Sequence, residues 1–139
     1  MKNPRGDLHL NVAGSLLVGL LFCYLFSGDS DREATAREVF TNFLSAFGCY
    51  TAASFLAYRL VPRPIITCVV AAGIGSFLFS SYLILPLVHA DSSLLGERIA
   101  GIVLYTPLLS SVAAPLLALT HLLAFVLRQE QKAKPIQSP

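Results

Sequence analysis

The stretch Arg59-Leu60-Val61-Pro62-Arg63-Pro64 separates two long hydrophobic halves of the chain. Each proline lacks a backbone N–H and disfavours helical geometry in the residue before it, so a continuous helix is not expected here. The two arginines favour a position in water rather than in hydrocarbon. We therefore expect a polar turn at this point, which joins two pairs of membrane-crossing helices.

The composition of the chain is typical of an integral membrane protein. Hydrophobic residues make up 55% of the 139 residues, and charged residues only 13%. A soluble domain of this size could not cover so much apolar surface, because small domains leave a large fraction of their surface exposed. The net charge of +2 is small and the basic residues form no dense cluster, so we expect the lipid bilayer and no nucleic acid as a partner.

Four segments without Asp, Glu, Lys or Arg have about the length that a membrane crossing requires. The first would rise ~29 Å as a helix, and the last would rise ~43 Å, more than the ~30 Å of hydrocarbon. Because the last segment also contains Pro107 and Pro115, we expect it to tilt or kink. The expected spans are 8–26, 39–58, 65–88 and 99–127.

These spans predict an all-α fold, an integral membrane four-helix transmembrane bundle with short loops. Residues 1–139 are expected to form a single membrane domain. A basic start followed by an apolar run is also typical of a signal peptide, but Phe26 stands where a cleavage site needs a small residue. We therefore expect the first helix to be retained.

Two features outside the spans carry further expectations. Ser30 and Glu33 have the spacing of a capping box, which predicts that the second helix begins there, in water. The polar segment 128–139 ends in Pro-Ile-Gln-Ser-Pro and predicts a disordered tail.

The distribution of basic residues predicts the orientation in the membrane. With four crossings, the two termini and the 59–64 turn share one side, which carries seven of the ten basic residues and two of the eight acidic ones. Loops rich in Lys and Arg stay in the cytoplasm. Both termini are therefore expected to be cytoplasmic, with the protein in the inner or plasma membrane.

The spans contain no group that would indicate catalysis or ion coupling. Ion-coupled transporters usually carry an ionisable residue at depth, and none of the four spans has an Asp, Glu, Lys or Arg. His9 and His121 belong to the same leaflet but differ in depth by roughly 8 Å, which fits a shared haem or metal poorly. No phosphate loop or catalytic triad is present. We expect no enzyme activity, no cofactor and no metal.

A stripe of small residues in the third span predicts close helix packing. Ala71 and Gly75, and likewise Ala72 and Ser76, are four residues apart and would share a helix face. Membrane helices gain packing energy by approaching closely at such faces. This face can pack within the bundle or against another copy or subunit, and the sequence leaves both interpretations open.

Aromatic and hydroxyl residues gather at one depth in the outer half of the membrane. Tyr24, Tyr82, Tyr105 and Thr106 fall there, and Pro107 removes the helical partner of the Val103 carbonyl. The cluster predicts either a small polar cavity for a lipid headgroup or solute, or an interfacial aromatic belt.

Two functions follow from these observations. The first is a non-catalytic accessory or structural subunit that assembles, as a homo-oligomer or in a larger membrane complex, through small-residue helix faces. The alternative is a small oligomeric transporter, or a carrier of lipid or small solutes, without an intramembrane carboxylate. The absence of intramembrane charge favours the first.

Overall fold

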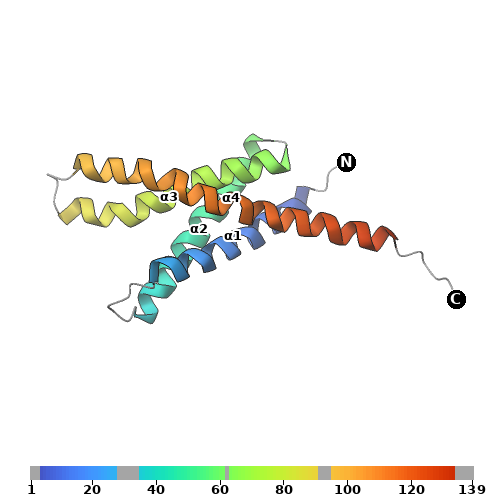
Figure 1. The fold of residues 1–139 in the computed structure, drawn as a ribbon, viewed down its shortest axis with the longest axis horizontal. Coiled ribbons are helices and arrows are strands. Elements are labelled where there is room, and N and C mark those ends of the chain that lie inside the picture. Colours follow the sequence, from blue (N-terminus) through green and yellow to red (C-terminus); the bar gives the residue numbers. More distant parts are fainter. Residues whose placement is uncertain (1–3, 28–34, 62, 91–94, 134–139) are drawn as a thin grey trace.

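The computed structural model describes residues 4–27, 35–61, 63–90 and 95–133, and it contains no strand in these ranges. It shows four helices, α1 (Pro4–Ser27), α2 (Ala36–Leu60), α3 (Pro64–Ala90) and α4 (Leu95–Ala133) (Figure 1). Each contains a segment long and apolar enough to cross a membrane. The prediction of an all-α protein with four helices long and apolar enough to span a membrane is confirmed.

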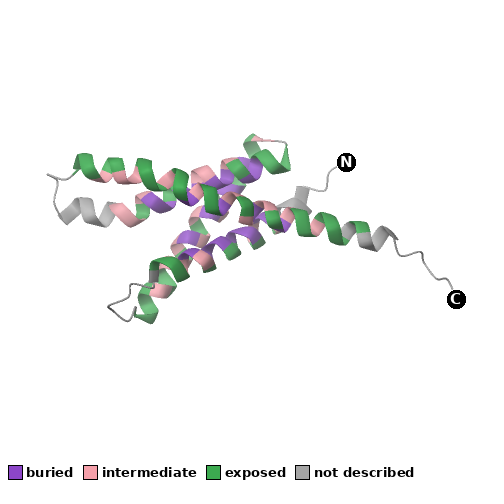
Figure 2. Ribbon diagram, viewed as in Figure 1, coloured by how far each residue is buried: buried purple, intermediate pink, exposed green. Residues whose placement is uncertain are grey.

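The helices pack in a ring that follows the order of the chain. α1 contacts α2, α2 contacts α3, α3 contacts α4, and α4 returns to α1. The α1–α2 and α3–α4 pairs cross near the middle of the molecule and diverge toward one end, while α4 extends past the crossing at the other (Figure 1). The buried residues gather at this crossing, and the helix ends are mostly exposed (Figure 2).

The turn between α2 and α3 lies where the prolines predict it. α2 ends at Leu60, Val61 is extended with φ −128° and ψ 120°, and α3 begins at Pro64. The Thr67 hydroxyl lies 3.0 Å from the carbonyl oxygen of Val61 and 2.8 Å from that of Arg63. Pro64 suits the first position of a helix because its missing N–H has no helical partner there. The turn is thus fixed by local chemistry.

An aromatic cluster joins three helices at the centre of the core. The rings of Phe22 in α1 and Phe79 in α3 stack with centroids 5.7 Å apart, and Tyr50 in α2 meets Phe22 edge-on at 5.6 Å. The Tyr50 hydroxyl lies 2.7 Å from Oγ of Ser76, so this polar atom is paired inside the apolar core. All four side chains are fully buried.

The start of α2 differs from the prediction. The helix begins at Ala36 with Thr35 as its N-cap, not at Ser30, and the Thr35 N–H donates to Oε2 of Glu38 at 3.1 Å. Thr35 and Glu38 have the same capping-box spacing, and they lie directly before the apolar run. The segment 28–34, with Ser30 and Glu33, lies outside the described residues.

Residues 128–133, the first part of the expected tail, continue α4. Arg, Gln, Glu, Lys and Ala in this stretch all have good helix propensity, so the helix extends beyond the apolar span. Residues 134–139 lie outside the described part of the chain.

Candidate functional site

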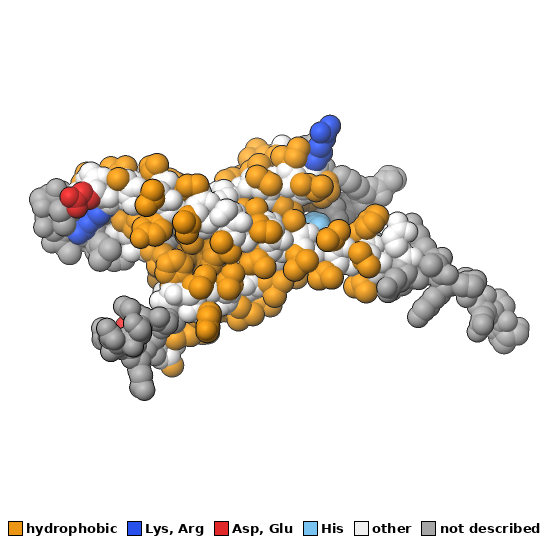
Figure 3. Space-filling model, viewed as in Figure 1, with side chains coloured by type: hydrophobic (Ala, Val, Ile, Leu, Met, Phe, Trp, Pro, Cys, Tyr) orange, Lys and Arg blue, Asp and Glu red, His pale blue; other side chains and the backbone are white. Residues whose placement is uncertain are grey.

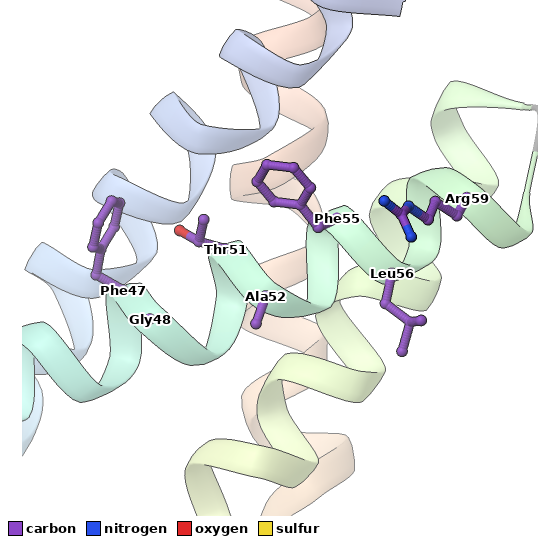
Figure 4. A pocket seen from close by; sticks show the side chains of 7 residues that line it. All are labelled: Phe47, Gly48, Thr51, Ala52, Phe55, Leu56 and Arg59. Atoms are coloured by element: carbon purple, nitrogen blue, oxygen red, sulfur yellow. The ribbon is translucent and has the colours of Figure 1, made fainter.

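A groove along the outer face of α2 is the candidate site (Figure 4). Its volume is about 560 Å³. Ligand pockets typically have ~300–1,000 Å³. The walls are mostly apolar, and one end carries a guanidinium group. It is lined by Phe47, Gly48, Thr51, Ala52, Phe55, Leu56 and Arg59.

Helical spacing and two small residues produce the groove. Gly48 and Ala52 are one turn apart and exposed, so the backbone of α2 is bare between them. A Cβ added at Gly48 would meet no atom within 4 Å, which shows that this part of the groove is open. Phe55 and Leu56, both nearly half exposed, continue the wall toward the end of the helix.

Phe47 closes the groove at its deep end, where α1 approaches α2. A Cβ added at Gly19 of α1 would lie 3.2 Å from Cβ of Phe47, so Gly19 permits this close approach. Phe47 also stacks on Phe43 with centroids 6.0 Å apart and an interplanar angle of 4°. The aromatic wall is therefore held by α1 and by the preceding turn of α2.

The two polar side chains of the groove differ in depth. Thr51 Oγ1 is buried and has no hydrogen-bond partner among the described residues. Arg59 is exposed, one residue before the end of α2. Arg63, also exposed, follows just after the helix, immediately before Pro64. The groove therefore runs from an apolar interior to a cationic rim, which is the polarity of an amphiphile.

The predicted tyrosine cavity is not this groove. Tyr24 in α1 is 78% exposed, Tyr82 in α3 40% and Tyr105 in α4 50%, so each ring lies on the surface. Tyr82 stacks on Phe79 with centroids 6.5 Å apart, and the Thr106 hydroxyl donates to the carbonyl of Ile102 at 2.7 Å. A shared cavity among these residues stays a prediction.

The small-residue stripe of α3 lies inside the bundle. Ala71, Ala72, Gly75 and Ser76 are all buried, and Gly75 faces the ring of Tyr50. A Cβ at Gly75 would lie 2.8 Å from Cε1 of Tyr50, which is closer than real Cβ contacts allow. This face packs against α2 of the same chain, so contact with a partner needs another surface.

His9 and His121 lie at the same end of the bundle but in different environments. Nε2 of His121 in α4 donates to Oδ1 of Asn11 in α1 at 2.7 Å, and Asn11 is buried. His9 is exposed. Among the described residues, no three His, Cys, Asp or Glu side chains are grouped as a metal site. The hydrogen bond between Asn11 and His121 joins α1 to α4.

Sequence reasoning missed the groove on α2. The available signal was Gly48 and Ala52, small residues four apart in the second span. The same helix also has the pair Ala53 and Ala57, which is buried in the core. Nothing in the order of residues distinguishes these pairs. No family model, curated protein or solved structure matches this chain.

Proposed function

We propose that this protein is a non-catalytic accessory or structural subunit, which assembles in the membrane with another protein or with further copies of itself. The observation that carries the proposal is the poor burial of α4. Of the apolar window Leu95–Leu127, 17% is buried within the chain, against 44% for Pro64–Ile84 of α3. Membrane helices gain energy from packing against other helices, so α4 offers the largest surface for a partner.

The C-terminal half of α4 supplies the proposed contact face. Leu119, Leu122 and Val126 stand at i, i+3 and i+7, and they are 42%, 59% and 46% exposed. Residues with this spacing share one side of a helix. Figure 3 shows hydrophobic side chains over the middle of the molecule and charged ones at its ends. An uncharged face of this kind suits another apolar helix.

Truncation of this face tests the proposal. The double variant Leu122→Ala/Val126→Ala is expected to reduce the oligomer or complex recovered from the native membrane several-fold, because it removes side chains that would fill the interface. Gentle detergent extraction followed by native mass spectrometry measures the recovery and the composition. The matched control is Ile66→Ala/Val69→Ala, which truncates two exposed residues of α3.

Recovery of the protein as a monomer from its native membrane would contradict assembly through α4. Equal assembly of both double variants would contradict it as well. A repeated molecular mass of this chain indicates a homo-oligomer. An additional mass indicates a larger complex.

We also propose that both termini are cytoplasmic. The start of α1, the α2–α3 turn and the end of α4 lie at the same end of the bundle (Figure 1). These segments carry the larger share of basic residues. In a variant without native cysteines, a cysteine at Ser138 should resist an impermeant maleimide added outside, whereas one at Ser30 should react. The reverse labelling pattern would show that both termini lie outside.

The groove on α2 favours a second candidate, a carrier of lipid or small solutes. Its apolar walls and cationic rim suit an amphiphile, although a carrier of this size would need to oligomerise to enclose a pathway.

A further inference from the structure

We propose that the groove on α2 is a binding site for one anionic phospholipid. An acyl chain would lie along Gly48 and Ala52, and the phosphate would meet the guanidinium of Arg59. The inference is independent of the partner proposed for α4, because the two surfaces belong to different helices.

The length of the groove matches one leaflet of a bilayer. From Phe47 to Arg59 the helix rises ~18 Å at 1.5 Å per residue. The hydrocarbon core of a bilayer is ~30 Å thick, so one leaflet contributes roughly half of that. Phe47 lies near the middle of the charge-free span and Arg59 directly after it. A single lipid chain would therefore reach from the rim to the deep end.

The shape of the groove suits a flexible chain. Gly48 and Ala52 keep the floor low, while Phe47, Phe55 and Leu56 stand around it (Figure 4). A helix of a second copy could also approach at two small residues. The cation at one end favours the lipid, because an apolar helix offers no counter-charge to Arg59.

The charge of the rim selects an anionic headgroup. Arg59 and Arg63 are both exposed, and neither forms an ion pair with a described residue. The N-terminus, the 59–64 turn and the C-terminal tail, which the sequence predicts on one side of the membrane, together carry seven basic residues and two acidic ones. A guanidinium binds phosphate oxygens with two parallel hydrogen bonds, and a basic side chain near the surface attracts anionic lipid. A zwitterionic lipid lacks the net charge that this rim favours.

The test measures lipid binding to the full-length protein. Native mass spectrometry in mild detergent would compare phosphatidylglycerol with phosphatidylcholine of the same acyl chains. We expect phosphatidylglycerol to bind more tightly, and Arg59→Gln to weaken its binding about five-fold, the effect of one surface charge. Gly48→Leu should weaken both lipids, because the new side chain fills the groove.

Two matched variants control for general effects. Arg37→Gln removes an exposed arginine at the other end of α2, and Gly73→Leu fills open space on α3. Both should bind phosphatidylglycerol like the unaltered protein, and all four variants should keep its melting temperature without added lipid.

Three results would overturn the proposal. Equal binding of the two lipids removes the charge argument, and unchanged binding in Gly48→Leu shows that lipid lies elsewhere. Loss of an oligomer in Gly48→Leu with lipid binding intact would assign the groove to a second helix.

Discussion

Gly75→Leu is expected to destabilise the folded bundle by about 3 kcal/mol, at the upper end of the usual cost of overpacking. Gly75 is buried against the ring of Tyr50, and even a single Cβ would lie 2.8 Å from Cε1 of that ring. Tyr50 has little room to move, because its hydroxyl pairs with Ser76 and its ring packs on Phe22. Thermal unfolding in mild detergent, followed by circular dichroism, measures the loss.

Gly73→Leu is the matched control for this substitution. Gly73 stands two residues away in the same helix, and a Cβ there would meet no atom within 4 Å. Its variant should melt within the experimental error of the unaltered protein. If the two leucine variants melted alike, the close contact between α2 and α3 at Gly75 would be wrong.

Phe79→Ala is expected to cost about 3 kcal/mol, the lower end of the range for deleting a buried aromatic ring. Phe79 is fully buried, and its ring contacts those of Phe22, Phe26 and Tyr82. Lipid tails are as apolar as the core, so the loss comes mainly from packing rather than from transfer out of water. Chemical denaturation from detergent micelles would give the change in the free energy of unfolding.

Phe77→Ala removes a phenyl ring from the same helix, but at an exposed position. It therefore separates the effect of lost packing from that of the changed composition. Phe77 is 54% exposed, so its substitution should change the free energy of unfolding by less than about 0.5 kcal/mol. Equal losses for the two alanine variants would mean that the aromatic cluster does not hold the bundle together.

Neither destabilising substitution touches the groove on α2 or the outer face of α4. Gly75 and Phe79 belong to the interior, whereas Gly48, Arg59 and Leu122 are exposed. Folding defects and binding defects are therefore separable by experiment. A variant that keeps its melting temperature but no longer binds lipid or a partner has lost a binding surface and not the fold.

The sequence by itself determined the number of long apolar helices and the place of the turn between α2 and α3. Charge-free spans and the closely spaced prolines Pro62 and Pro64 are local features. A charge in the hydrocarbon is costly, and a missing backbone N–H interrupts a helix, whatever the rest of the chain does. The α2–α3 turn therefore lies where the prolines predict it. Capping is also local, and Thr35 with Glu38 caps α2, whereas Ser30 and Glu33 lie outside the described residues.

Only the tertiary structure decided which face of each helix lies inside. In a soluble helix the polar side marks the surface, but in a bilayer both lipid and core accept apolar residues, so the pattern of hydrophobicity carries little information about direction. The small residues of α3 lie inside because they accommodate Tyr50, and Gly48 and Ala52 of α2 lie outside because that helix turns Tyr50, Ala53 and Ala57 to the core. Side-chain packing between helices made that choice, and with it placed the candidate site on α2.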